Sequence, residues 1–464
     1  MVSVYKSEIG RAVNSTLVLV LAGGQGSRLH ELTNTRAKPC LEFGASYRLI
    51  DFPLSNCINS GLKRIGIVTQ YKSQSLLHHL VGQSCQFNNN SGEFLELLPA
   101  SQQHSKDWYS GTADALYQNI DFIKSINPQR VLVLSGDHIY KMDYRNMLED
   151  HIRNNADMTV SCIEVPIAEA RGQFGVMSVN DNQRIDSFEE KPLFPKSLED
   201  NPGHVLASMG NYVFNTDFLI EKLQSDALNN DSQHDFGKDI IPKVISESEI
   251  YAFRFRGENN AIPYWKDVGT LDSYWSANMD LLDNNPPMIM PESYWPICSA
   301  PSSLPPSRIA SNSEHSVQIN DSMIGNGCEL NACDVEHSII SDRVTLQSGA
   351  SIEDSLLLPE VTIGENCQIS NAIIDAGCVV PADTCIGLNK TVDEMNGFRV
   401  TEKGVTLATQ AAIEKLKRRA PLQLASSEAR WNACVCAFKT KNAEPLTFSH
   451  LSKSISIPEL KYLG

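Results

Sequence analysis

The 464-residue sequence contains no hydrophobic run of about 18 residues, the length that a helix needs to cross a membrane. Residues 1–16 hold no apolar core of the length found in secretory signal peptides. Paired cysteine motifs are also absent: the twelve cysteines are scattered, and the only close pair is Cys434 and Cys436. We therefore expect a cytoplasmic protein with free thiols, without disulfides or a zinc site.

Positive charge is scarce, because 39 Lys and Arg stand against 55 Asp and Glu and give a formal net charge of −16. This excess argues against non-specific binding to nucleic acid and against adhesion to an anionic membrane surface. A local cluster of Arg and Lys can still hold a small phosphate ligand. The length, with 42% hydrophobic and 20% charged residues, indicates a globular chain of about two or three domains.

The two commonest phosphate-binding motifs are missing from a glycine-rich segment near the N-terminus. The apolar run of residues 17–22 is typical of a buried parallel strand and leads directly into Gly23, Gly24 and Gly26. The segment lacks both the Gly-Lys-Ser/Thr ending of a P-loop and the Gly-x-Gly-x-x-Gly spacing of dinucleotide-binding folds. It can form an anion nest of backbone N–H groups, with Arg28 as a further donor, or a tight strand-to-helix turn.

Strand-like and helix-like segments alternate through residues 17–282, which predicts an α/β domain with a Rossmann-like, mostly parallel sheet. Because ligands bind at the carboxyl ends of parallel strands, the glycine loop and Asp137 are expected to face one crevice. Residues 1–16 are interpreted as an N-terminal tail. The expected strands are 17–21, 65–69, 130–135, 158–165, 174–179 and 208–214, and two expected helices are 112–125 and 142–154.

Residues 283–308 hold seven of the 22 prolines and are typical of an extended linker. From 309 to 400, apolar residues recur every five to seven positions, with Ile-Gly steps such as Ile324-Gly325. This hexapeptide pattern favours a left-handed parallel β-helix over an antiparallel β-sandwich. Residues 407–419 are expected to form a capping helix within a C-terminal segment, 401–464, of unknown role.

Two aspartates from distant segments are candidate metal ligands. Asp137 follows a buried strand, where a carboxylate serves as a metal ligand or a general base. Asp267 precedes a glycine turn and could equally be a turn former. If they meet over a phosphate nest, they would hold Mg²⁺, which prefers one or two carboxylates plus phosphate oxygens. Lys38 and Lys191 are each followed by proline, which favours an extended lysine backbone; the alternative for both is an exposed surface lysine.

A series of motifs carries a family resemblance across residues 17 to about 275. The chain resembles the glucose-1-phosphate adenylyltransferases, the ADP-glucose pyrophosphorylases of bacterial glycogen synthesis. The resemblance implies a Mg²⁺-dependent reaction of ATP with α-glucose 1-phosphate that gives ADP-glucose and pyrophosphate, in a homotetramer. The motifs are LAGGQGSRL, RAKP, RLIDFPLSNCINSG, IVTQY, WYSGTADA, SGDHIYKMDY, FGVM, FEEKP, ASMGNYVF, HDFGKDIIP and YWKDVGT.

The resemblance also implies roles for individual residues. Because the sugar phosphate is already an anion, no general base is needed, and catalysis is expected from positioning and charge neutralisation. Arg28 and Lys38 would stabilise charge on the triphosphate, and Asp137 and Asp267 would hold Mg²⁺. The nucleotide is expected at Gly23, Gly24, Gly26, Gln70 and Gly111, and glucose 1-phosphate at Tyr109, Gly175, Glu190, Lys191 and Ser208.

The chain departs from the family at positions that serve regulatory anions. Enterobacterial members are activated by fructose 1,6-bisphosphate and inhibited by AMP. Arg36 and Arg48 remain, but basic family residues are replaced by Gln25, Thr35, Glu42, Ser125 and the pair Asn396-Gly397. Because a sugar bisphosphate needs several cationic donors to offset its desolvation, we expect a weak response or none to fructose 1,6-bisphosphate.

Other functions stay open at this point. The main alternative is a non-catalytic regulatory subunit of a heteromeric enzyme, which would be expected to lose Arg28, Lys38 or Asp137, although none is lost here. A nucleotidyltransferase for a different base or sugar is a second alternative. An acyltransferase is a third, although the β-helix segment shows no clear catalytic histidine on a loop insertion.

Overall fold

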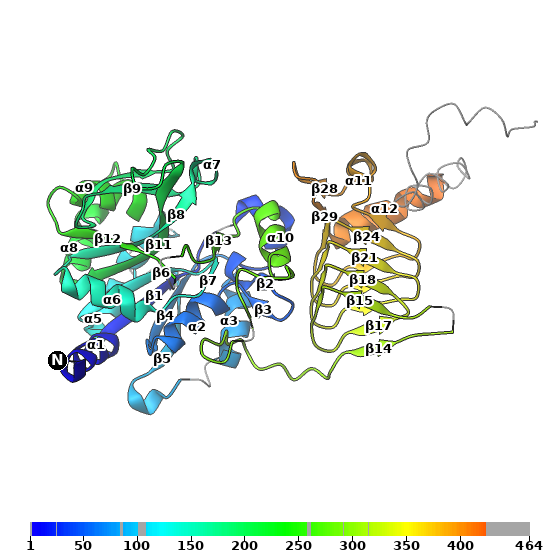
Figure 1. The fold of residues 1–464 in the computed structure, drawn as a ribbon, viewed down its shortest axis with the longest axis horizontal. Helices are drawn as coiled ribbons and strands as arrows, with labels where there is room; N and C mark the ends of the chain where they lie inside the picture. Colours follow the sequence, from blue (N-terminus) through cyan, green and yellow to red (C-terminus); the bar gives the residue numbers. More distant parts are fainter. Residues whose placement is uncertain are drawn as a thin grey trace, which may run out of the picture.

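The computed structural model describes residues 2–24, 26–83, 87–100, 108–257, 261–290, 292–313 and 315–423. They form an α/β domain and, beside it, a stack of short β-strands that ends in a helix (Figure 1). Both parts agree with the predicted fold class. Gln25 and the segment beyond residue 423 lie outside the described residues.

A nine-stranded sheet forms the centre of the first domain. Its strands are β1 (Thr16–Leu21), β4 (Arg64–Thr69), β5 (Phe94–Pro99), β6 (Arg130–Ser135), β8 (Met158–Pro166), β9 (Gly175–Val179), β10 (Ile185–Glu190), β11 (His204–Asn215) and β12 (Ile250–Arg254). The order is β10-β9-β11-β6-β1-β4-β5, with β8 paired to β11 and β12. β1 lies parallel to β4 and β6, so their carboxyl ends meet at one edge, whereas β11 is antiparallel to β6 and β8.

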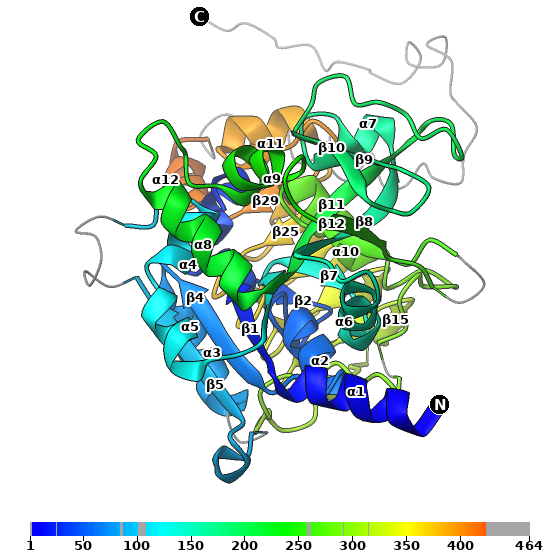
Figure 2. The ribbon, with the colours of Figure 1, turned by 90° about the vertical axis from the view of Figure 1, so that its left-hand side faces the viewer.

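Helices cover both faces of this sheet (Figure 2). The helices of this domain are α1 (Val2–Asn14), α2 (Asp51–Asn59), α3 (Ser73–Gln83), α4 (Thr112–Tyr117), α5 (Ile120–Ile126), α6 (Tyr144–Arg153), α7 (Ile167–Ala170), α8 (Thr216–Ala227), α9 (Ile241–Val244) and α10 (Leu271–Met279), of which α10 packs in a separate cluster with β-helix residues. Leu17 and Leu19 of β1 pack with residues of α4, α5 and α8, and Val18 and Val20 pack with residues of α2 and α6. This alternation explains the unbroken apolar run, because both faces of β1 are buried. No helix of the described chain is long and apolar enough to cross a membrane.

Two segments show local structure that the sequence did not predict. The segment interpreted as an N-terminal tail contains α1: Ala12 and Val13 are buried, and Val13 belongs to a core cluster with residues of α6. The expected helix 112–125 is divided into α4 and α5. The Nδ2 of Asn119 donates to the carbonyl of Ala115 at 2.7 Å, so a side chain competes with the helical backbone hydrogen bonds at the break.

The second domain consists of three parallel sheets, consistent with a left-handed β-helix. The first contains β14 (Arg308–Ala310), β17 (Glu329–Asn331), β20 (Thr345–Leu346), β23 (Thr362–Ile363) and β26 (Val379–Val380); the second contains β15 (Gln318–Asn320), β18 (Asp334–Glu336), β21 (Ser351–Glu353), β24 (Gln368–Ser370) and β27 (Cys385–Ile386). The third contains β16 (Met323–Ile324), β19 (Ile339–Ile340), β22 (Leu356–Leu357), β25 (Ala372–Ile374) and β29 (Thr406–Ala408), with β28 (Arg399–Val400) antiparallel at its edge. Leu330, Leu346, Ile363 and Val380 stack in register, as the hexapeptide pattern predicts.

The end of the β-helix differs from the prediction. Residues 406–408 continue the third sheet as β29, so the helix expected at 407–419 begins later, as α12 (Gln410–Gln423). A short helix, α11 (Lys390–Asn396), precedes β28. Leu407 and Ala408 are fully paired with β25 and buried, which is why they adopt strand and not helix geometry.

The proline-rich linker lies against the first domain. The described residues between α10 and β14 form no regular element. The linker is nevertheless held in place: the side chain of Asn59 in α2 donates to the carbonyl of Pro296, and Ser55 accepts from the backbone of Cys298. Met288 and Met290 are buried in a hydrophobic cluster that contains residues of both domains. The two domains therefore share one interior.

Candidate active site

The glycine-rich loop joins β1 to a 3-10 helix, η1 (Ser27–Thr33), and passes close to the end of β4. A Cβ atom on Gly23 would lie 3.4 Å from the Cβ of Gln70, which directly follows β4. Gly26 has a φ of +63°, and a Cβ there would lie 3.2 Å from the Cβ of Lys38. Glycine at position 26 thus permits a left-handed turn and lets the Lys38 stem approach the loop. The segment is therefore a strand-to-helix turn, and its backbone lies open beside Lys38.

Two short antiparallel strands bring the distant aspartates together. They are β7 (His138–Tyr140) and β13 (Trp265–Asp267), and Asp267 lies opposite His138 in their register. Asp137 immediately precedes β7. The Nζ of Lys38 lies 2.7 Å from Asp137 Oδ2 and 3.1 Å from Asp267 Oδ1. One ammonium group therefore bridges the two carboxylates.

The charges of this cluster stabilise one another. Burial alone would raise the pKa of Asp137, but the Lys38 ammonium, together with a 2.5 Å hydrogen bond from the Ser135 hydroxyl, holds it well below its usual value. The pKa of Lys38 is raised, because the two carboxylates outweigh the effect of its burial. Lys38 and Asp137 are consequently ionised around neutral pH, and Lys38, which is buried, is not the exposed surface lysine of the alternative interpretation.

Arg28 lies at the rim of the same cluster. Its Nη2 is 3.9 Å from Asp267 Oδ2, and its Nη1 donates to the side chain of Gln173 at 2.7 Å. A Cβ on Gly269 would lie 2.7 Å from Arg28 Nη2, so the glycine turn after Asp267 makes room for the guanidinium. Half of the Arg28 side chain remains exposed, which leaves donors free to contact a ligand.

The donor set at this edge fits a divalent cation. Ligand atoms of Asp137, His138 and Asp267 all lie within 4.8 Å of one another. Two carboxylates beside an open glycine loop match the preference of Mg²⁺ for a few protein oxygens completed by phosphate oxygens. The sequence predicted the two aspartates but not His138.

The residues expected to hold glucose 1-phosphate lie partly together. Glu190 stands opposite Gly175 in the β9–β10 ladder, and a Cβ on Gly175 would lie 2.9 Å from the Glu190 carboxylate and 2.4 Å from the Phe188 ring. Burial raises the pKa of Glu190, and Lys191 Nζ lies 3.4 Å from its carboxylate. Ser208 is buried in β11 and accepts the N–H of Gly210.

The predicted extended backbone of the two lysines was wrong. Lys191 has a φ of +50°, because its N–H closes the hairpin by donating to the Phe174 carbonyl at 3.1 Å. Lys38 begins a 3-10 helix, η2 (Lys38–Cys40). Hydrogen bonds of the surrounding fold outweigh the weak preference that the following proline imposes.

Gly111 owes its identity to packing. A Cβ at this position would lie 2.2 Å from the carbonyl oxygen of His234, which accepts the N–H of Ala113. The WYSGTADA and HDFGKDIIP segments, far apart in the sequence, thus pack directly against each other. Tyr109 is tied to it as well, since its hydroxyl accepts from Asn119 at 2.9 Å.

The candidate allosteric residues meet between the domains and are already paired. Arg36 lies 2.7 Å from Asp375 of the β-helix and 3.5 Å from Glu42, and Arg48 lies 3.1 Å from the same Glu42. Glu42 is 7% exposed. Two carboxylates, Glu42 and Asp375, therefore pair with both arginines that remain of the basic set, while Thr35 is exposed to solvent.

Comparison with known proteins identifies the family. The family described as nucleotidyl transferase matches residues 17–284, and the family described as GlmU-like, C-terminal hexapeptide matches residues 305–408. The glucose-1-phosphate adenylyltransferase of Shewanella oneidensis is 51% identical over 404 residues, which cover 87% of this chain and 96% of that protein. That of Teredinibacter turnerae is 50% identical over 410 residues, or 88% and 97% of the two chains.

The chain belongs to the glucose-1-phosphate adenylyltransferase family. It is accordingly a nucleotidyltransferase, and the resemblance stated from its motifs is confirmed.

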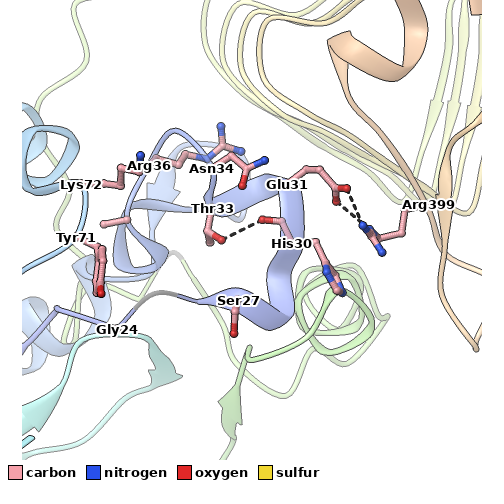
Figure 3. A pocket seen from close by; sticks show the side chains of 11 residues that line it. Gly24, Ser27, His30, Glu31, Thr33, Asn34, Arg36, Tyr71, Lys72 and Arg399 are labelled. Carbon is pink, nitrogen blue, oxygen red and sulfur yellow. Dashed lines mark hydrogen bonds and ion pairs between the residues drawn. The ribbon is translucent and has the colours of Figure 1, made fainter. Parts of the chain in front are cut away.

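A cavity of about 480 Å³ opens beside the glycine loop, between the two domains (Figure 3). Arg36, Lys72 and Arg399 line it, and Glu31 of η1 pairs with Arg399 of β28 through contacts of 2.7 Å and 2.8 Å. Tyr71, also in the wall, stacks on Trp108 with ring centroids 5.7 Å apart. Sequence reasoning missed Lys72 and Tyr71, although they directly follow Gln70 at the end of a predicted strand. Nothing in the sequence indicates that Arg399 lines this cavity, because its position depends on how the two domains pack.

Proposed function

We propose that this chain transfers the adenylyl group of ATP to α-D-glucose 1-phosphate, giving ADP-glucose and pyrophosphate for glycogen synthesis. The observation that carries the proposal is the cluster of Lys38, Asp137 and Asp267 beside the glycine loop in a member of this family. Each of these groups would act on phosphate charge, as nucleotidyl transfer requires.

Each group has a role in this reaction. Backbone N–H groups at Gly23, Gly24 and Gly26 cradle the triphosphate, with Gln70 beside the base. Lys38 and Arg28 stabilise the charge that shifts to pyrophosphate as the sugar phosphate oxygen attacks the α-phosphorus. Asp137 and Asp267 would hold a Mg²⁺ ion, which would supply positive charge to the phosphate groups. Glu190 and Lys191 hold glucose 1-phosphate, with Tyr109, Gly175 and Ser208 around them.

A pyrophosphate-release assay on the purified chain tests this function. It would compare ATP, dTTP and UTP against glucose 1-phosphate, with Asp137→Ala as the inactive control. Release that requires ATP and Asp137 supports the proposal, and release with dTTP or UTP instead of ATP would replace it by transfer of another nucleotide. Activity absent before and after the substitution would support a regulatory subunit, an alternative that the intact cluster does not favour. The expected homotetramer stays a prediction, which mass photometry checks.

We further propose that fructose 1,6-bisphosphate activates this enzyme weakly or not at all. Arg36 is already paired with Asp375 and Glu42, and Arg48 with Glu42, so an entering bisphosphate would have to displace a buried carboxylate. Ser125 and the Asn396-Gly397 pair add no cation. A tenfold or larger fall in the half-saturation concentration for ATP, on adding millimolar fructose 1,6-bisphosphate, would contradict this proposal.

A further inference from the structure

His138 lies next to both candidate metal ligands but has no part in the function described so far. Its Nε2 atom is 3.6 Å from Asp137 Oδ1 and 3.9 Å from Asp267 Oδ1. Two ligands of one ion at bond lengths of about 2.1 Å lie at most about 4.2 Å apart. Both distances fall within that limit, so one cation can reach the imidazole and either carboxylate.

The other ring nitrogen is committed to the backbone. His138 Nδ1 lies 3.1 Å from the carbonyl oxygen of Met209, and a carbonyl only accepts, so Nδ1 carries the hydrogen. Nε2 is then the ring nitrogen that faces the two aspartates and can offer a lone pair to a cation. Metal-binding histidines are commonly held in this way, with the second nitrogen donating to a carbonyl.

Local structure fixes this orientation. Met209 lies where the β11–β8 register shifts between Ser208 and Tyr212, and Gly210, with a φ of +69°, follows it. The irregularity turns the Met209 carbonyl toward β7. On its other side the His138 ring packs edge-on against Trp265 of β13, with centroids 5.2 Å apart. The His138 ring therefore lacks the rotational freedom of a surface histidine.

We infer that His138 Nε2 is a third ligand of the divalent cation at Asp137 and Asp267, and that it shifts the site's preference from Mg²⁺ toward Mn²⁺ and Co²⁺. Imidazole nitrogen binds divalent first-row transition ions, least strongly Mn²⁺ and more strongly Co²⁺, whereas Mg²⁺ favours oxygen ligands. The inference rests on the metal site of the proposed function. Lys38 shares both carboxylates and competes with the ion for them.

Pulsed EPR of Mn²⁺ bound to the full chain, without nucleotide, tests the inference. A directly bound imidazole imprints ¹⁴N modulation on the Mn²⁺ signal. We expect this modulation in the native chain and in His78→Gln, a control at an exposed histidine of α3, and its loss in His138→Gln. Calorimetry should show Mn²⁺ affinity falling about tenfold in His138→Gln, with a smaller change for Mg²⁺.

Labelling the native chain with ¹⁵N-histidine keeps the test independent of folding in the variant. The ¹⁴N pattern should give way to a ¹⁵N coupling. Absence of nitrogen coupling in the native chain, failure of Mn²⁺ to bind it, or coupling that persists unchanged in a folded His138→Gln would overturn the inference. If pyrophosphate release with ATP and glucose 1-phosphate is intact in that case, the proposed function stands alone. If nitrogen coupling is observed but no pyrophosphate is released, the assignment of His138 as a metal ligand stands and the proposed function is overturned.

Discussion

Replacing Lys38 with methionine should destabilise the protein near neutral pH and much less in acid. The substitution leaves Asp137 and Asp267, whose side chains are 26% and 16% exposed, facing each other without the ammonium. Removing one partner of a buried ion pair costs about 3–5 kcal/mol, and we take about 3 kcal/mol because both carboxylates keep some contact with water. At about 2 °C per kcal/mol for a domain of this size, the melting temperature should fall by about 6 °C.

The stability difference between the native chain and the Lys38→Met variant should depend on pH. The folded-state pKa of Asp137 lies below its unfolded value of about 3.9, so the ion pair contributes fully above that pH and is lost as the pH falls below it. Without Lys38, the two ionised carboxylates repel each other in the folded state, and protonation removes this repulsion. Differential scanning fluorimetry from about pH 4 to 8 should therefore show the gap between native chain and variant closing toward acid. Lys403→Met, at an exposed turn residue, is the control. A variant as stable as the native chain at neutral pH, or a gap constant with pH, would refute the reasoning.

Four further substitutions are predicted from close contacts and buried charges. Gly111→Ala should lower the melting temperature sharply or abolish folded expression, since its Cβ would lie 2.2 Å from a backbone oxygen; Gly10→Ala, an open exposed position in α1, should raise stability by about 0.5–1 kcal/mol. Glu42→Gln should free Arg48 and leave Arg36 paired with Asp375 alone, so a measurable activation by fructose 1,6-bisphosphate should appear in ATP saturation curves; an unresponsive, active variant would count against the charge argument. Burial raises the pKa of Asp393 to about 6, so its protonated form is favoured by folding and stability is lost as the pH rises through that value. Asp393→Asn should therefore melt higher than the native chain at pH 8 but not at pH 5, and equal curves at both would contradict this.

The sequence predicted the parts of the site that depend on local pattern. The glycines end a strand that is apolar on both faces, and Asp137 ends a second strand beside it, so their shared edge followed from the rules of parallel sheets. The repeat of apolar residues predicted the β-helix, because each coil must bury its side chain against the next. Motifs that match the family supplied the remaining residues.

Features that depend on contacts between distant segments could not be derived from local pattern. The meeting of Asp137 with Asp267 needs the β7–β13 pair, which no periodicity reveals because each strand has three residues. His138 became a candidate only through the Met209 carbonyl. In the same way, a hairpin hydrogen bond overrode the proline rule at Lys191, and β29 extended the β-helix past its predicted end.

The hydrophobic cluster shared by the two domains brings the β-helix into contact with the segments that carry Asp137 and Asp267. Ile139 of β7 and Val268, which follows β13, belong to the same cluster as Ile339, Leu356 and Ile373 of the third β-helix sheet. The neighbours of Asp137 and Asp267 thus rest on the stack of coils. Cutting the chain in the linker would expose this apolar surface on both fragments, so the protein is expected to unfold as one cooperative unit. A change in the packing of the coils would accordingly be transmitted to Asp137 and Asp267 without any ligand bound.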